Sequence, residues 1–191
     1  MHLEEALSSK MDIKAFIFDM DGLLFDSERI VQRSWEMAGD ELGIPHMGDV
    51  IYHTLGMNRT GRNEYFRKYI REDFPFEEFG RLTRDNFWKI VDKEGLPLKK
   101  GVKELLAYGK AQGYKMAVAT SSSREYAMGN LIRAGIDPYF DSVICGDMVK
   151  KAKPDPEIYQ KASESLGIPP EYCMAFEDAP GGILSAHQAG M

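Results

Sequence analysis

Four short apolar runs, separated from one another by longer segments, constrain the fold of this chain most strongly. The runs cover residues 14–18, 115–120, 142–145 and 173–176. Each has the length of a buried strand, and the three segments between residues 102 and 166 have the length and polar–apolar spacing of helices. Short apolar strands that alternate with amphipathic helices indicate βα units around a parallel sheet. The sequence therefore predicts an α/β fold with a parallel sheet.

The stretch from residue 28 to residue 96 has a different pattern. It contains helix-like pieces at 28–42, 59–71 and 77–93 and no convincing strand, with aromatic residues at helical spacing. We therefore predict an α/β core formed by residues 12–27 and 97–191, with a helical module of residues 28–96 inserted after the first strand. Residues 1–11 are predicted to be an N-terminal extension.

Charge and composition exclude some classes of partner. The formal net charge is −6, so no surplus of basic residues is available to neutralise nucleic-acid phosphates. No run is long and apolar enough to span a bilayer, and the first ten residues do not resemble a signal peptide. Cys145 and Cys173 both stand in apolar runs and are predicted to be buried free thiols. These features favour a soluble cytoplasmic protein, with a monomer as the default expectation.

Polar residues stand at the end of the predicted strands. Asp19 follows the first strand, Thr120 and Ser121 end the second, and Glu177 and Asp178 follow the fourth. In an open parallel sheet, the functional crevice lies beyond the carboxyl ends of the strands. We therefore expect these carboxylates and hydroxyls to converge on one edge of the sheet.

The first of these motifs, FDMDG, has carboxylates at positions i and i+2, followed by Gly22. Asp19 could attack phosphorus, and Asp21 could hold or release a proton for the leaving group. Gly22 allows a tight turn where a side chain would obstruct the site. The alternative is an ordinary turn at a strand end, but three further polar motifs on the same edge argue against it.

The second and third motifs supply groups suited to a phosphate. Thr120 and Ser121 begin a hydroxyl cluster before a predicted helix, where free N–H groups can hold an anion, although helix capping would also explain such hydroxyls. Lys153 precedes Pro154 in the motif KPDP, so its loop is restrained. Its ammonium could neutralise both a phosphate oxygen and the nucleophilic carboxylate.

The fourth motif, FEDAPGG, has two adjacent carboxylates at a strand end. Oxygen ligands of this kind suit Mg²⁺, which keeps several waters and bridges to substrate phosphate. An acidic helix N-terminus would explain one of these carboxylates but not both. Glu177 and Asp178 are therefore predicted metal ligands.

The ordered motifs FDMDG, ATSS, KPDP and FEDAPGG resemble those of the haloacid dehalogenase-like superfamily. The helical insert after the first motif is similar to its C1-capped branch, and to β-phosphoglucomutase-like and small-sugar phosphatase proteins in particular. The resemblance covers nearly the whole chain from about residue 12. It implies a Rossmann-like core with a helical cap that closes over the site.

The resemblance also implies roles for individual residues. Asp19 would form an aspartyl-phosphate, and Asp21 would be the general acid and base. Thr120 and the backbone of Ser121 would hold the phosphoryl group, and Lys153 would stabilise its charge. A small phosphate ester would be the substrate, and Mg²⁺ the cofactor. The metal would be bound by Asp19, the Asp21 carbonyl and Asp178, with Glu177 nearby, either directly or through a water.

Hydrolysis and sugar-phosphate transfer remain open as activities. The β-phosphoglucomutases have a histidine in the cap hinge, whereas the comparable position here falls near Val31. In the other direction, the segment GMNR ending at Arg59 resembles a cap segment whose arginine binds a distal phosphate. We therefore expect a phosphatase, with a mutase as the first alternative and a catalytically silent phospholigand-binding protein as the second.

The resemblance carries one further expectation, about the end of the chain. The family normally supplies another strand after the position that corresponds to Met191. The fourth strand would then lack a neighbour on one side, and we expect the chain as given to be incomplete and less stable than an extended form.

Overall fold

The computed structural model describes residues 12–54 and 59–191, with only the backbone described for Arg59 and Thr60. These residues form two compact units: one from Ser27–Leu96, and one from the chain on either side of it. Each unit is described by itself. No helix in the described residues is long and apolar enough to cross a membrane.

The unit outside Ser27–Leu96 is built on four parallel strands in the order β3-β2-β1-β4. The strands are β1 (Ala15–Phe18), β2 (Lys115–Ala119), β3 (Ser142–Ile144) and β4 (Cys173–Phe176). Strand β1 is central, with Phe18 opposite Val118 of β2 and Phe176 of β4. The predicted α/β fold with a parallel sheet is confirmed, and each strand lies within one residue of the predicted range.

The chain crosses the sheet in two directions from β1. It passes first to β2 and β3 on one side, and then returns to β4 on the other. Ligands of open parallel sheets bind at such a switch point, beyond the carboxyl ends of the strands. Asp19 and the pair Glu177–Asp178 follow the two strands that flank this point.

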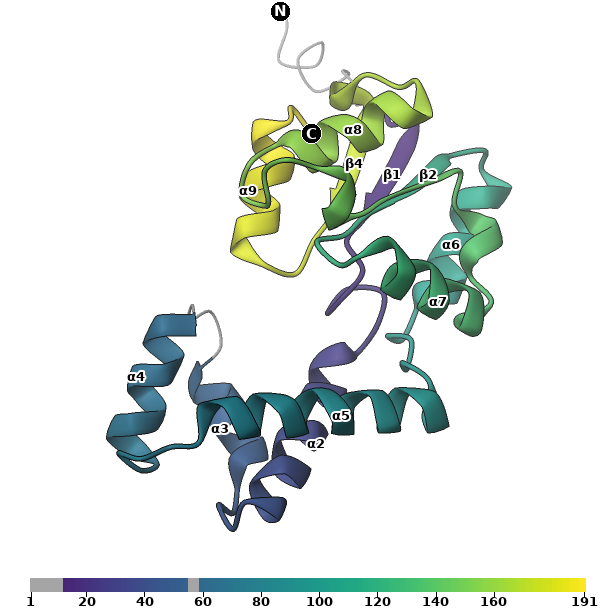
Figure 1. The fold of residues 1–191 in the computed structure, drawn as a ribbon. Coiled ribbons are helices and arrows are strands. Elements are labelled where there is room, and N and C mark those ends of the chain that lie inside the picture. Colours follow the sequence, from purple (N-terminus) through teal and green to yellow (C-terminus); the bar gives the residue numbers. More distant parts are fainter. Residues whose placement is uncertain (1–11, 55–58) are drawn as a thin grey trace, which may run out of the picture. The chain divides into compact units, whose positions relative to one another are not determined.

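The helices of this unit cover the two faces of the sheet (Figure 1). They are α6 (Val102–Ala111), α7 (Arg124–Ala134), α8 (Glu157–Leu166) and α9 (Pro180–Gln188), with 3-10 turns at Asp137–Tyr139, Gly146–Met148 and Pro170–Tyr172.

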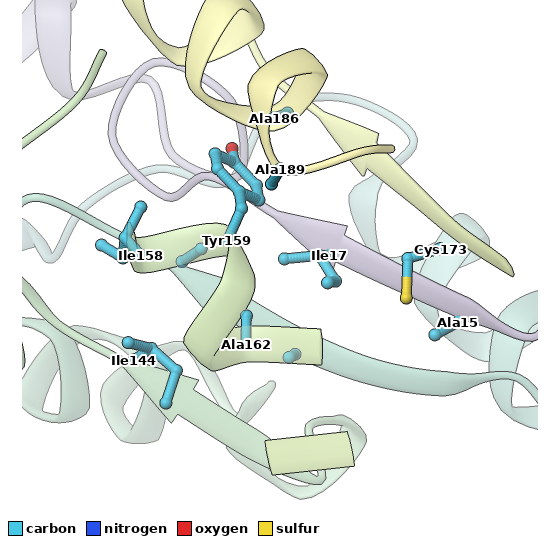
Figure 2. Close-up of a cluster of buried hydrophobic side chains, with 11 residues drawn as sticks. Ala15, Ile17, Ile144, Ile158, Tyr159, Ala162, Cys173, Ala186 and Ala189 are labelled. Carbon is cyan, nitrogen blue, oxygen red and sulfur yellow. The ribbon is translucent and has the colours of Figure 1, made fainter. Parts of the chain in front are cut away.

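Successive strand residues point to opposite faces, and all four residues of the central strand β1 are buried. Ala15 and Ile17 of β1 pack into a cluster with residues of α8 and α9, including Tyr159 and Ala186 (Figure 2). On the opposite face Phe16 stacks on Tyr114, with ring centroids 4.2 Å apart. Burial on both faces explains why β1 is a continuous apolar run.

Strand β4 pairs with β1 alone among the described residues, so its outer edge has no strand partner. A groove of about 690 Å³ follows this edge and is lined by Cys173, Met174 and Ala175 together with residues of α9. Met174 is 39% exposed there.

The unit Ser27–Leu96 contains only helices among its described residues. They are α2 (Ser27–Glu41), α3 (Met47–Thr54), α4 (Arg59–Tyr69) and α5 (Phe76–Glu94). Its core is aromatic: the ring of Trp35 lies edge-on to Phe66 and Phe79, at 5.7 and 5.5 Å. Helix α3 was not among the predicted helical pieces.

Candidate active site

Asp19 occupies the carboxyl end of the central strand. Its backbone N–H donates to the carbonyl oxygen of Phe176 at 2.9 Å, which fixes the main chain against β4. Its side chain is only 12% exposed. The sequence alone predicted this position, because Asp19 directly follows the apolar run that forms β1.

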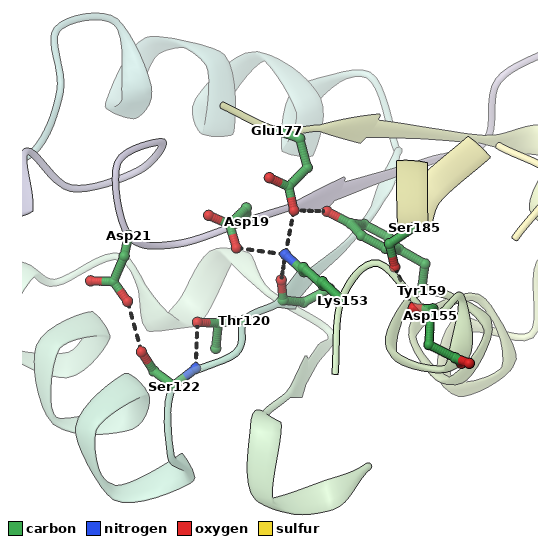
Figure 3. A network of polar contacts seen from close by, with 10 residues as sticks. Asp19, Asp21, Thr120, Ser122, Lys153, Asp155, Tyr159, Glu177 and Ser185 are labelled. Carbon is green, nitrogen blue, oxygen red and sulfur yellow. Dashed lines mark hydrogen bonds and ion pairs between the residues drawn. The ribbon is translucent and has the colours of Figure 1, made fainter. Parts of the chain in front are cut away.

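Lys153 lies directly beside Asp19 (Figure 3). Its Nζ donates to Asp19 Oδ1 at 2.7 Å, to the Ala119 carbonyl at 3.0 Å and to Glu177 Oε1. The lysine comes from the loop before α8. The carboxyl ends of β1, β2 and β4 therefore meet at one ammonium group. The ammonium can therefore neutralise charge on Asp19 and on an anion bound beside it.

The residues present fit a divalent metal ion. Carboxylate oxygens of Asp19, Glu177 and Asp178 all lie within 4.8 Å of one another. When ionised, they carry three negative charges against the one positive charge of Lys153. Oxygen ligands with excess negative charge are the donor set that Mg²⁺ prefers.

Two glycines make room for these carboxylates. A Cβ at Gly22 would lie 2.1 Å from Asp178 Oδ2, and one at Gly182 would lie 2.0 Å from Glu177 Cδ. Gly22 also has a φ of +81°, which a side chain would disfavour. The glycines that end the first and fourth motifs are thus required by the close approach of the acidic groups.

Burial is the main influence on the pKa of Asp19. It raises the pKa of Asp19 to about 7, against the lowering effect of the Lys153 charge, and Glu177 and Asp178 raise it further. Burial also raises the pKa of Asp178. A cation at this cluster would oppose these effects, because it stabilises the ionised carboxylates.

Tyr159 supports the cluster from the core of the sheet. It is fully buried, and its hydroxyl donates to Glu177 Oε1 at 2.6 Å. The Lys153 ammonium lies 5.0 Å from the centre of its ring. Burial, followed by the hydrogen bond to Glu177, raises the pKa of Tyr159, so its hydroxyl remains a donor.

Two hydroxyl groups of the cluster after β2 accept hydrogen bonds from backbone N–H groups, one within the loop and one at the start of α7. Thr120 is 1% exposed, and its Oγ1 accepts from the Ser122 N–H at 3.2 Å. Ser123 caps α7, accepting from the Tyr126 N–H at 3.4 Å. A Cβ at Gly146 would lie 2.2 Å from the Ser121 carbonyl, so this loop packs tightly against the loop after β3. Ser121 is exposed at the edge where Asp19 lies.

The carboxylate of Asp21 has two partners of its own, of which Ser122 is drawn in Figure 3. Its Oδ2 accepts from Ser122 Oγ at 2.7 Å, and its Oδ1 accepts from the Tyr126 hydroxyl at 3.0 Å. Asp21 is not part of the side-chain carboxylate cluster in the described residues. The predicted use of its backbone carbonyl as a metal ligand stays a prediction.

Sequence reasoning missed Tyr126 and Tyr159 as parts of this site. Both stand in the first turn of the helix that follows a site motif, at α7 and α8. That position was a usable signal, since first-turn side chains lie near the carboxyl edge of the sheet.

Arg59, the predicted cap residue, begins α4 in the other unit. Its side chain lies outside the described residues, so its role stays a prediction.

Comparison with known proteins decides the family. The model for haloacid dehalogenase-like hydrolases matches residues 13–190. The chain belongs to the haloacid dehalogenase-like hydrolase family. The resemblance predicted from the four motifs is therefore confirmed, and the chain is an enzyme of this hydrolase family.

Named relatives of this hydrolase include the phosphorylated carbohydrates phosphatase of Thermotoga maritima. It is 32% identical over 94% of this chain and 82% of its own length. A family hydrolase from Deinococcus radiodurans, solved with bound phosphate and sodium, has a TM-score of 0.81 at 26% identity, covering 94% of this chain and 79% of that one. A β-phosphoglucomutase from Clostridium difficile has a TM-score of 0.66 at 25% identity, covering 94% and 82%.

Proposed function

We propose that this hydrolase is a Mg²⁺-dependent phosphatase that acts on a small phosphorylated carbohydrate through a phosphoryl-Asp19 intermediate. The observation that carries the proposal is the contact of Asp19 with Lys153 at 2.7 Å, beside two further carboxylates able to hold a metal. The Thermotoga maritima relative, named for phosphorylated carbohydrates, supports this substrate class.

The proposed reaction has two steps. An Asp19 oxygen attacks phosphorus and the bond from phosphorus to the sugar oxygen breaks, while Asp21 gives that oxygen a proton. Water then attacks the phosphorus of phosphoryl-Asp19, Asp21 takes the water proton, and inorganic phosphate leaves with Asp19 restored. Each step transfers one phosphoryl group and one proton, so the general acid of the first step becomes the base of the second.

Charge neutralisation supports this assignment. Phosphoryl transfer depends mainly on positioning and on stabilising the charge of the transferring group. Lys153 supplies one positive charge beside Asp19. Asp19, Glu177, Asp178 and the Asp21 carbonyl would hold Mg²⁺, which supplies the further positive charge when bound. Thr120 and the Ser121 backbone would hold the remaining phosphoryl oxygens.

The test is the release of inorganic phosphate from a panel of sugar phosphates, with Mg²⁺ and with a chelator. We expect phosphate release only when Mg²⁺ is present and none with the chelator. In Asp19→Asn the rate of release should fall by at least about a thousandfold, because the amide is not a nucleophile. Tyr108→Phe, on the exposed face of α6, is the control and should keep full activity. Turnover by Asp19→Asn would remove Asp19 as the nucleophile.

The Clostridium difficile structure supports a mutase as the second candidate. β-Glucose 1-phosphate, offered with a sugar bisphosphate activator, separates the two. A phosphatase gives glucose and phosphate, whereas a mutase gives glucose 6-phosphate. Binding of a sugar phosphate in calorimetry without either product would instead indicate a silent binding protein.

A further inference from the structure

Two hydroxyl groups from a different part of the chain hold the carboxylate of Asp21. Ser122 Oγ donates to Oδ2 at 2.7 Å and the Tyr126 hydroxyl donates to Oδ1 at 3.0 Å. Ser122 lies in the loop after β2 and Tyr126 in the first turn of α7, about a hundred residues from Asp21 along the chain. Each carboxylate oxygen thus has one donor, and the two donors come from one short segment.

Two donors on separate oxygens restrain both the position and the rotation of the carboxylate. A carboxylate has about four lone-pair sites, so each Asp21 oxygen keeps a site at which it can hold or take a proton. Burial and the nearby Asp21 charge raise the pKa of Tyr126, which keeps its hydroxyl a donor. The arrangement therefore orients Asp21 without blocking it.

We propose that Tyr126 and Ser122 are positioning residues for proton transfer by Asp21, an inference that rests on the proposed function. A displaced acid or base loses much of its effect, since small misplacements in a site reduce rates by large factors. Tyr126 would act on the leaving-group proton through Asp21 and would not touch the phosphoryl group. The alternative is that these hydrogen bonds only tie two loops together.

The test compares turnover of two substrates whose leaving groups differ in their need for a proton. A sugar oxygen needs a proton as its bond to phosphorus breaks, whereas p-nitrophenolate leaves without one. In Tyr126→Phe we expect turnover of the best sugar phosphate to fall about tenfold. The first release of p-nitrophenolate, followed by stopped flow before water attacks phosphoryl-Asp19, should change by about twofold or less. Tyr108→Phe on α6 is the matched control for both substrates.

A double-mutant cycle separates positioning from loop stability. In an Asp21→Ala background, Tyr126→Phe should reduce turnover of the sugar phosphate no further, because the hydroxyl then has no carboxylate to position. Ser122→Ala should behave in the same way as Tyr126→Phe. The inference is supported if Tyr126→Phe keeps the melting temperature of the wild type and still loses about tenfold in turnover of the sugar phosphate.

Equal losses for both substrates, no loss, or a further loss in the Asp21→Ala background would each overturn it. The proposed function would survive those results, because they leave wild-type turnover and the Asp19→Asn result unchanged. A wild-type protein without turnover would overturn the proposed function and this inference together.

Discussion

At the residue scale, one ammonium group organises the candidate site. Lys153 donates to Asp19, Glu177 and the Ala119 carbonyl, and Tyr159 supports the same carboxylate of Glu177 from the core. A buried charge without such partners would be strongly destabilising, so the polar groups of the site depend on one another. Changes at single residues should therefore alter both stability and ligand binding.

Metal binding should depend on pH through Asp19. Its pKa is raised to about 7, so most of the metal-free protein has Asp19 protonated below pH 7 and ionised above it. A metal needs the ionised form and must displace this proton at lower pH. We expect Mg²⁺ to bind about tenfold more weakly at pH 6 than at pH 8, with proton release in calorimetry. An affinity that is constant over this range would contradict the prediction.

Removing the Tyr159 hydroxyl should destabilise the protein. Tyr159→Phe keeps the ring and its contact with Lys153 but removes the hydrogen bond to Glu177. A hydrogen bond to a charged group contributes about 1.5–3 kcal/mol, so we expect a loss of about that size in the free energy of unfolding by urea. Tyr108→Phe should change it by less than about 0.5 kcal/mol. A Tyr159→Phe protein as stable as the wild type would show that the bond contributes nothing.

At the scale of elements, the loops at the carboxyl ends of the strands hold most groups of the candidate site. Gly22 turns the loop after β1 with a φ of +81° and leaves space for Asp178. Positive φ alone does not cause this crowding, because Gly113 before β2 also has a positive φ and a Cβ there would meet no atom within 4 Å. A comparison of Gly22 with Gly113 therefore separates the effect of backbone strain from the effect of crowding at the site.

Gly22→Ala should therefore affect function more than Gly113→Ala. Both changes place a side chain at positive φ, which costs about 1 kcal/mol. Only at Gly22 would the new Cβ lie 2.1 Å from Asp178, displacing a proposed metal ligand. We expect Gly22→Ala to weaken Mg²⁺ binding at least tenfold in calorimetry, with Gly113→Ala unchanged. Equal affinity in the two variants would show that Gly22 has no role at the site.

The elements differ in how well sequence predicts them. Strands such as β1 were predictable because burial on both faces requires a continuous apolar run, and that run also locates Asp19. Helix α3 was missed because its eight residues are too few for a clear helical period. The first-turn position of Tyr126 in α7 indicates that it lies near the carboxyl edge, but its contact with Asp21 depends on packing, which local sequence does not encode.

At the scale of the whole molecule, the chain divides into two units with separate cores. The aromatic core of Ser27–Leu96 includes Trp35, Phe66 and Phe79. The described groups of the candidate site, from Asp19 to Asp178, all belong to the other unit. Binding of metal should therefore depend on one unit alone.

Phe66→Ala tests this separation. Phe66 is 2% exposed and its ring contacts those of Trp35 and Phe79. Its loss should cost about 3–5 kcal/mol in the unfolding of the helical unit. Calorimetry should nevertheless give Mg²⁺ affinity within about twofold of the wild type. Loss of Mg²⁺ binding in Phe66→Ala would show that the two units are not independent in this respect.

The central claim is that Asp19 carries the phosphoryl group, and the most direct measurement is to trap it there. The enzyme would be quenched in acid during turnover of a sugar phosphate with Mg²⁺, and the peptide containing Asp19 examined by mass spectrometry. We predict one phosphoryl group on Asp19, absent from Asp19→Asn and from the reaction with chelator. Phosphate release with no covalent phosphoryl group, or with the group on another residue, would contradict the account.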